Sequence, residues 1–363
     1  MNLAHSLCSV LLLAACAGCG GGGAGAPQGV PPTIAFTGIG SLPGDISSQA
    51  SAVSADGSVV VGISKSVSGK AQAIRWSTSE GMTGLGFMAR GTSSNARAVS
   101  ADGAVIVGDG GAQDTGSAVF RWQASTGLVQ LTALADSSLC VAAGVSGDGE
   151  VLVGTCVLAG NSAFRWTEST GMVPLGQFGT GSNRTSNALA VSNDASTIVG
   201  VGHPVLTGAV LWNLVGEASI LGRLSDDVSA GATAVSRDGS VVVGYSTQGS
   251  SRQRAFRWTP QTGMTAIAST TDSLTDVIAS SVSGDGQVIV GWGNTPNGET
   301  ALIWDEAHGL RRLEDMLKAD YQTTIAGWVL LRATAISDDG RSIVGMGVNP
   351  SGNSEGWILK LPD

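Results

Sequence analysis

The chain has 363 residues, of which 42% are hydrophobic and only 13% charged, and its formal net charge is −9. The 54 glycines are about twice the ordinary share and recur at intervals, which indicates many tight turns. The 19 basic residues are scattered, and the longest basic run is Arg311-Arg312. Binding to nucleic acid or to an anionic membrane surface needs clustered Lys and Arg, so we expect neither partner.

The N-terminus has the pattern of an export signal. The apolar segment LCSVLLLAA (7–15) is too short to span a bilayer and fits a secretory signal peptide, which we place at residues 1–15. The end of this segment together with the next residue, Leu13-Ala14-Ala15-Cys16, resembles a bacterial lipobox, in which the cysteine is diacylated and becomes the first mature residue. Cys16 is therefore the predicted lipidation site, and Cys19 is a second candidate.

The segment after Cys16 predicts how the protein is held. Residues 16–35 are rich in glycine and end in prolines, which is typical of a flexible tether. Residue 17, directly after the predicted lipidation site, is Ala and not Asp, which resembles the default signal for sorting a lipoprotein to the outer membrane. We therefore expect a lipid-anchored protein of the bacterial cell envelope, placed in the outer membrane. The membrane is then contacted only through the N-terminal lipid. A freely secreted protein is the alternative.

Residues 36–363 carry one repeated pattern. A first block reads A-x-A-V-S-x-D-G-x-V-V-V-G, a second reads A-F-R-W, and a third reads G-M-x-x-L-G. The aspartates of the first block are Asp56, Asp102, Asp148, Asp194, Asp238, Asp285 and Asp339. The tryptophans of the second block, seven of the nine in the protein, are Trp76, Trp122, Trp166, Trp212, Trp258, Trp304 and Trp357. The two interleaved series define seven copies.

Each copy predicts four short strands. A-x-A-V-S is a strand of small residues, S-x-D-G is a turn, and V-V-V-G is a strand buried on both faces. The second and third blocks supply two more strands. Four strands per copy, repeated seven times, are typical of an all-β seven-bladed propeller of antiparallel blades. An open β-solenoid is the second choice, but its coils are usually shorter and need polar caps.

The ends of the repeat region suggest how the ring closes. The seventh copy lacks its fourth strand, and residues 36–44, FTGIGSLPG, resemble that missing block. We expect this N-terminal strand to complete the last blade and remove an exposed edge. The long connection between the sixth and seventh copies contains LEDMLKADYQTT (313–324), in which Leu313, Met316 and Leu317 have helical spacing, so we expect a short helix that caps one face.

Two cysteines lie within the repeat region. Cys140 and Cys156 lie eight residues on either side of Asp148, at the open end of one predicted hairpin. Antiparallel pairing places them opposite each other and within disulfide reach, and export makes oxidation favourable. We expect a disulfide.

The linked blocks A-F-R-W-x-x-x-x-G-M-x-x-L-G and A-x-A-V-S-x-D-G-x-V-V-V-G resemble those of the HAF-repeat extracellular proteins of bacteria. The ending GWVLLRATAISDDGRSIVGMGVNPSGNSEGWILKLP (327–362) is similar to the last repeat of that family. The histidine of the family's namesake triplet is absent from all seven copies. The resemblance covers nearly the whole mature chain and implies an exported surface protein with no established chemistry.

Several residue types that could carry chemistry have simpler interpretations. The seven aspartates lie one per blade and are expected to form turns, because a calcium site needs several oxygen ligands in one loop. His203 and His308 lie in different blades outside any ligand spacing, so we expect no metal and no cofactor. The G-x-S-x-G match at 352–356 lies between strands, whereas a nucleophile elbow needs a following helix.

Trp292 and Trp328 break the repeat and are the ligand-binding candidates, with local packing as the alternative. We expect a monomeric, non-enzymatic binding or scaffold module for an envelope protein or glycan. The alternative is an envelope enzyme acting on glycans through carboxylates that meet in the central funnel, for which the loop residues Asp114, Asp226, Asp227 and Asp276 are candidates. A purely structural surface-layer component is a third possibility.

Overall fold

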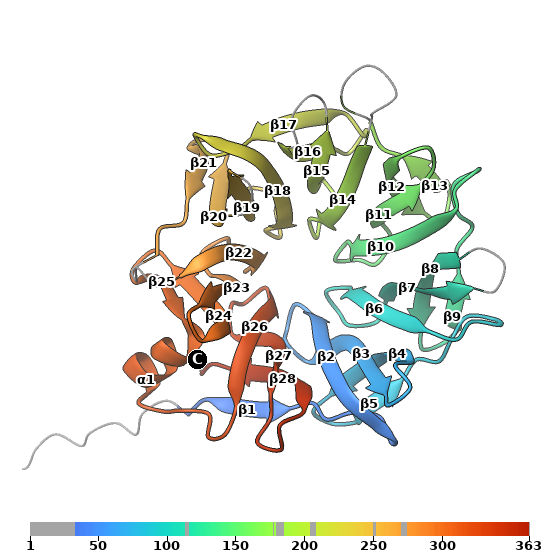
Figure 1. Cartoon of the computed structure of the whole chain (residues 1–363). Coiled ribbons are helices and arrows are strands. Elements are labelled where there is room, and N and C mark those ends of the chain that lie inside the picture. Colours follow the sequence, from blue (N-terminus) through green and yellow to red (C-terminus); the bar gives the residue numbers. More distant parts are fainter. Residues whose placement is uncertain are drawn as a thin grey trace, which may run out of the picture. The chain divides into compact units, whose positions relative to one another are not determined.

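The computed structural model describes residues 33–112, 116–176, 178, 185–203, 208–249, 252–269 and 274–362. The predicted signal peptide, Cys16 and most of the tether lie outside these ranges. Seven four-stranded antiparallel sheets surround a central axis (Figure 1), which confirms the seven-bladed propeller. Among the described residues, no helix has the length and apolar character needed to cross a membrane.

The blades use the segments of the repeat in the predicted order, from the axis outward. The innermost strands are β2 (Asp45–Val53), β6 (Ser94–Val99), β10 (Leu139–Val145), β14 (Thr185–Val191), β18 (Asp227–Val235), β22 (Thr275–Val282) and β26 (Val329–Ile336). The second strands are β3 (Val59–Ser66), β7 (Ile106–Ala112), β11 (Leu152–Val157), β15 (Thr197–His203), β19 (Val242–Gln248), β23 (Ile289–Thr295) and β27 (Ser342–Val348). The third strands are β4 (Ala71–Ser77), β8 (Gly116–Gln123), β12 (Asn161–Thr167), β16 (Gly208–Asn213), β20 (Arg252–Thr259), β24 (Gly298–Asp305) and β28 (Ser354–Lys360). The outermost strands are β5 (Gly81–Gly84), β9 (Gly127–Gln130), β13 (Gly171–Pro174), β17 (Ala218–Gly222), β21 (Gly263–Ala266), β25 (Gly309–Arg312) and, in the last blade, β1 (Ala35–Gly38).

The β-branched second strands are buried on both faces, as their sequence predicts. Val60 and Val61 point to opposite sides of their sheet, and both are fully buried. The repeated tryptophans pack between the blades, and Trp212 and Trp357 are fully buried. Each blade therefore needs its two neighbours to keep its apolar faces from water, and the ring is stable only as a whole.

The S-x-D-G turn is built from side-chain hydrogen bonds that recur in every blade. In the second blade, the Ser100 hydroxyl donates to Asp102 Oδ1 at 2.6 Å and accepts from the backbone N–H of Val105 at 2.9 Å. Gly103 between them has φ +72°, and a Cβ there would lie 2.6 Å from Val59 Cγ2 of the preceding blade. The turn glycine thus serves the backbone and the contact between blades. Only the fourth copy replaces it, with Ala195 at φ 59°.

The N-terminal strand closes the ring as expected. β1 pairs antiparallel with β28, from Ala35 opposite Lys360 to Gly38 opposite Trp357. The Phe36 ring packs 5.1 Å from Trp328 and 6.0 Å from Trp357, measured between ring centroids. Because this strand supplies both backbone pairing and a partly buried ring that packs on Trp328 and the buried Trp357, it joins the two ends of the chain in one blade.

The helix in the long connection is present but does not cap a face. Helix α1 (Leu313–Tyr321) buries Leu313, Met316 and Leu317, in agreement with their predicted spacing. It packs beside β24 and β25 at the outer side of the ring (Figure 1). Its apolar residues join the cluster around Trp357, so the insertion fills the outer wedge between the sixth and seventh blades.

Candidate functional site

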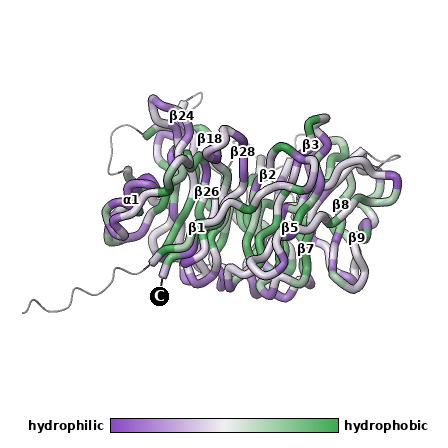
Figure 2. Tube along the Cα trace, turned by 90° about the horizontal axis from the view of Figure 1, so that it is seen from below, coloured by the Kyte–Doolittle hydropathy of each residue, from purple (hydrophilic) through white to green (hydrophobic). Residues whose placement is uncertain are grey.

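The strands run between two faces, which Figure 2 shows edge-on. We call the face that carries the S-x-D-G turns the turn face. At the axis of this face, the backbone N–H of each x residue donates to the carbonyl of the x residue in the next blade. The seven hydrogen bonds, 2.9–3.2 Å long, form a closed ring through Ala55, Ala101, Gly147, Asn193, Arg237, Gly284 and Asp338.

Three side chains of this ring fill its centre. The Asn193 amide donates to Asp338 Oδ2 at 2.7 Å, and Arg237 Nε lies 4.0 Å from the same oxygen. Burial raises the pKa of Asp338, while Arg237 and Asn193 act in the opposite direction. Backbone hydrogen bonds and this polar cluster therefore narrow the central channel at the turn face, where Arg237 and Asp338 also line a hollow of about 600 Å³.

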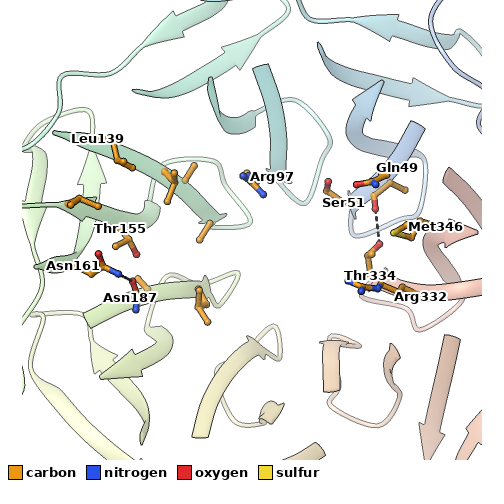
Figure 3. Close-up of a pocket in the computed structure, with 17 residues that line it drawn as sticks. Gln49, Ser51, Arg97, Leu139, Thr155, Asn161, Asn187, Arg332, Thr334 and Met346 are labelled. Atoms are coloured by element: carbon orange, nitrogen blue, oxygen red, sulfur yellow. Dashed lines mark hydrogen bonds between the residues drawn. The ribbon is translucent and has the colours of Figure 1, made fainter. Parts of the chain in front are cut away.

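The opposite end of the channel opens into a cavity of about 620 Å³, which we call the mouth cavity. It is lined from the first, second, third, fourth and seventh blades, and Figure 3 shows Leu139 and Asn187 on one side, with Arg332 and Met346 across from them. Many of its side chains flank the first repeated alanine of A-x-A, where the copies differ. These flanking residues are Gln49, Ser51, Arg97, Val141, Ala143, Asn187, Leu189, Arg332 and Thr334.

Two arginines give the mouth cavity its charge. Arg97 donates through Nε to Asp109 Oδ1 at 2.7 Å and through Nη2 to Asp109 Oδ2 at 3.4 Å. Arg332 holds both carboxylate oxygens of Glu299 through the same two nitrogens and stacks 4.1 Å from the Trp292 ring centroid. The hydrogen bond from Arg332 lowers the pKa of Glu299, so this pair stays ionised.

The two tryptophan candidates lie apart. Trp292, in β23, is half-buried beneath Arg332 and thus supports one side of the mouth cavity. Trp328 packs against Phe36 at the ring closure, where its role is local packing. Sequence reasoning did not identify Arg97 and Arg332. The signal that could have found them is that the residues on either side of the first alanine of A-x-A vary between copies, although the alanine itself repeats.

Of the four acids proposed for an enzyme, the three that the structure describes do not line the mouth cavity, and Asp227 and Asp276 lie in strands and not in loops. Asp227 is buried and pairs with Arg254 at 2.7 Å, while Asp226 is an exposed residue with φ 67° just before β18. Asp276 accepts hydrogen bonds from the Gln253 backbone and the Asn294 amide. Asp114 lies outside the described residues. Carboxylates share a hollow at the turn face, where Asp56, Asp285 and Asp339 are held inside their turns next to Asp338. Asp45 and Glu355 line a second, smaller hollow of about 220 Å³.

The remaining candidates have separate surroundings. His308 Nδ1 lies 2.7 Å from Asp305 Oδ1 on an exposed turn, and the side chain of His203 is outside the described part. Within that part, no three His, Cys, Asp or Glu residues gather as metal ligands would. Ser354 of the G-x-S-x-G match begins strand β28, and no helix follows it.

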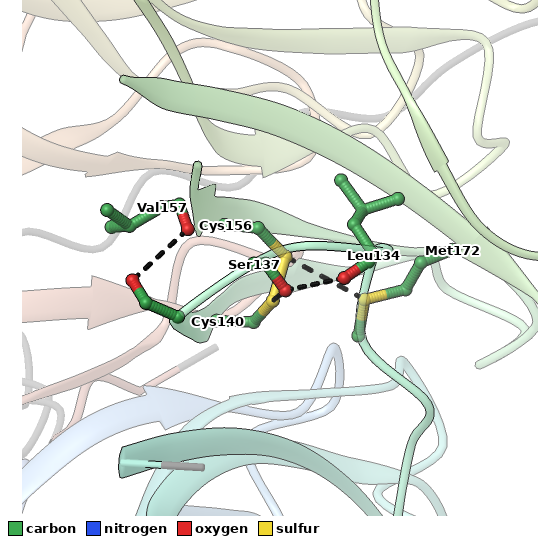
Figure 4. Close-up of a disulfide and its surroundings, with 7 residues drawn as sticks. Leu134, Ser137, Cys140, Cys156, Val157 and Met172 are labelled. Atoms are coloured by element: carbon green, nitrogen blue, oxygen red, sulfur yellow. Dashed lines mark hydrogen bonds between the residues drawn. A yellow bond between two sulfur atoms is a disulfide. The ribbon is translucent and has the colours of Figure 1, made fainter. Parts of the chain in front are cut away.

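The two cysteines of the third blade are joined in the structure. Cys140 of β10 and Cys156 of β11 are direct partners in the strand register, and their sulfur atoms form a disulfide (Figure 4). Both are buried, and Met172 Sδ lies 4.0 Å from Cys156 Sγ. The disulfide joins β10 to β11 directly next to the pair Leu139 and Val157, which form part of the mouth cavity wall.

No protein-family model and no curated protein matches the sequence. The structure is similar to oligogalacturonate lyase from Vibrio parahaemolyticus, with TM-score 0.58, 12% identity, and coverage of 92% of this chain and 98% of that one. It is also similar to the propeller domain of the trilobed protease from Pyrococcus furiosus, with TM-score 0.58, 12% identity, and coverage of 86% and 95%. That propeller is described as having an open velcro topology, whereas β1 completes the last blade here.

A third match is TolB from Acinetobacter baumannii, with TM-score 0.49, 14% identity and coverage of 70% of this chain. The chain spans 63% of that protein. These neighbours include a lyase, a protease domain and TolB, which have different functions. The likeness shows the fold alone.

Proposed function

We propose that this chain is a non-enzymatic binding module of the bacterial cell envelope, anchored by a lipid on Cys16, which takes its partner at the mouth cavity. The observation that carries the proposal is the contrast between the two ends of the channel. At the turn face, a ring of backbone hydrogen bonds narrows the channel beside a hollow of about 600 Å³ that is lined mainly by turn residues, whereas the other end is a cavity of about 620 Å³ lined by five blades with residues that differ between them. A cavity of this size, with apolar walls and a few polar groups, is typical of a ligand-binding pocket.

The strand register indicates at which end of the propeller the tether is attached. Ala35, just after the tether, pairs with Lys360, and Lys360 pairs with Ser342 directly after the last S-x-D-G turn. The tether therefore joins the propeller at the turn face. With a lipid on Cys16, the point of attachment is at the turn face, and the mouth cavity lies at the opposite end of the propeller. The resemblance to HAF-repeat extracellular proteins supports the same exported location.

The anchor is tested by replacing Cys16 with Ser in the bacterium that produces the protein. We expect the wild-type protein in the membrane fraction with a diacylated N-terminal cysteine, detected by mass spectrometry, and the Cys16→Ser variant in the soluble fraction. Replacement of Cys19 with Ser is the matched control and leaves the lipid in place. A wild-type N-terminus without lipid would contradict the anchor.

The binding face is tested by photo-crosslinking in the same cells. A photoreactive amino acid replaces Met346 in the mouth cavity or, as the control, the exposed Ser169 on the turn face. We expect a defined partner adduct from position 346 and none from position 169. An adduct only from the turn face, equal adducts from both positions, or none from position 346 would contradict the proposed binding site.

A further inference from the structure

We infer that the mouth cavity binds a peptide segment of a partner protein, through a carboxylate held by Arg97 and Arg332 and an aliphatic side chain packed on the opposite wall. The inference rests on the proposed function, because it names the chemistry of the partner at the same site.

The first support is the charge of the cavity wall. Arg97 and Arg332 line it from two different blades, and none of the described lining residues is a carboxylate. Their partner acids, Asp109 and Glu299, stand outside the lining. The charged groups on the cavity wall are therefore two guanidinium groups, which favours a ligand group with negative charge.

The second support is that both guanidinium groups are held in position. Each uses its Nε and Nη2 nitrogens for its own carboxylate, and the Nη1 nitrogen of each has no hydrogen-bond partner among the described residues. Arg332 is further fixed by stacking on Trp292. An arginine oriented in this way loses little side-chain freedom when a second carboxylate binds its open edge.

The third support is the opposite wall, which selects a peptide over a sugar. Leu139, Val141, Val157 and Leu189 form an aliphatic surface, and the neighbouring Asn161 amide donates to Asn187 at 3.0 Å. Aliphatic side chains pack against other aliphatic chains, while amides match the donors and acceptors of a peptide backbone. No aromatic ring that could stack on a sugar is among the described lining residues.

The rim around the cavity fits a protein partner as well. Ile46, Val228 and Val329 each lie four residues before the first repeated alanine of their innermost strand, at the mouth end. They are 53%, 49% and 50% exposed, respectively. Exposed aliphatic residues around a polar opening are typical of a protein interface, so the peptide segment would belong to a larger docked surface.

The test uses the full mature chain carrying Cys16→Ser, which keeps it soluble, on an array of immobilised peptides. The peptides end in every pair of amino acids, once with a free carboxylate and once amidated, and a third set is amidated but contains Asp or Glu beside each aliphatic residue. We expect the strongest retention for peptides that combine Leu, Ile or Val with a carboxylate. The free-terminus and internal-acid sets separate the two sources of that carboxylate.

Variants then test the assigned residues. Arg97→Gln and Arg332→Gln should each weaken the best peptide at least tenfold. Arg312→Gln is the matched control, because Arg312 makes the same two-nitrogen contact with Asp315 beside α1, outside the cavity, and it should leave the affinity unchanged. Circular dichroism melting of all three variants checks that the fold is intact.

Three results would overturn the inference. Amidated peptides without acids could bind as well as the others, or Arg312→Gln could weaken binding as much as the cavity variants. Alternatively, no peptide is retained while a polyuronate binds in the same assay, which assigns the arginines to an acidic glycan. Crosslinking at Met346 does not depend on ligand chemistry, so the proposed function can survive any of these results.

Discussion

The turn face takes one turn from each of the seven blades, and the mouth cavity is lined by five of the same blades, yet the two follow opposite rules. At the turn face, Ser54, Asp56 and their six counterparts repeat the same hydrogen bonds in every blade. At the mouth cavity, three residues before these turn serines, the side chains change from Ser51 to Arg97 to Ala143. Repetition accompanies the hydrogen bonds that close the ring, and variation accompanies the open site.

In a repeat protein of this kind, the side chains that vary between copies are the first candidates for function. The most regular residues, Asp and Trp, are explained by turns and by packing between blades. A residue whose side chain changes between copies is not required by the shared turn or by the packing between blades, and its side chain can serve a ligand. If this division holds, substitutions at the turn face and in the blade contacts lower the free energy of unfolding, and substitutions in the mouth cavity change binding.

The largest effect is expected at the ring closure. Removal of residues 1–39 takes away β1, and with it the Phe36 ring between Trp328 and Trp357. We expect the free energy of unfolding to fall by about 3 kcal/mol or more, because a partly buried aromatic residue and a paired strand are lost together. Urea unfolding followed by tryptophan fluorescence measures it. Removal of residues 1–32 is the control, and equal stability of the two truncations would contradict the closure.

The next effect is expected at the disulfide. Cys140 and Cys156 are 16 residues apart in sequence, and opening a loop of this size costs about 3 kcal/mol by the chain-entropy relation. Replacing both with Ala should lower the urea midpoint accordingly. A count of free thiols in the unreduced Cys16→Ser mature protein gives an independent check. Cys19 is then the one expected thiol, and three would show that the bridge does not form.

A smaller effect separates two serines of one strand segment. Ser54 is fully buried, donates to Asp56 and accepts from the Val59 backbone N–H, which would be left without its partner in Ser54→Ala. We expect a loss of about 1–3 kcal/mol. Ser51 lines the mouth cavity, and Ser51→Ala should change stability by less than about 0.5 kcal/mol. If the two variants unfold alike, stability does not divide between the two ends as described.

The smallest effect is the dependence of stability on acid. Hydrogen bonds from Ser100 and Ser146 lower the pKa of Asp102 and Asp148 in the folded protein. Their stabilisation is complete above the unfolded pKa and is lost as the pH falls through the folded pKa, so the urea midpoint should decrease below about pH 4. Asp102→Asn should decrease less steeply over the same range. A midpoint that rises on acidification would show that Asp338, whose pKa is raised, dominates instead.

Much of the fold could be predicted because each local signal was repeated seven times. The blade count, the strand order, the closing strand and the helix at Leu313 all follow from periodic patterns that act over short distances. The ring of backbone hydrogen bonds could not be foreseen, since it depends on how seven blades meet at the axis. No single copy contains that information.

The candidate site was harder for the same reason. Trp292 attracted attention as an aromatic residue outside the repeat, but its contact with Arg332 comes from the neighbouring blade. Arg97 stands inside a repeated strand and has no motif around it. Its partner Asp109 is in the next strand, so the pair emerges only from the strand register. Residues that meet across blades carry no fixed spacing in the sequence.

The most direct measurement compares one bulky side chain at the two ends of the propeller. Ser51→Trp fills the mouth cavity from β2, and Ser169→Trp places the same side chain on the turn face. Each is combined with the photoreactive residue at position 346, after melting confirms that both variants stay within about 2 °C of the parent. We predict that the partner adduct disappears with Ser51→Trp and keeps its yield with Ser169→Trp. Equal yields from the two variants would contradict binding at the mouth cavity.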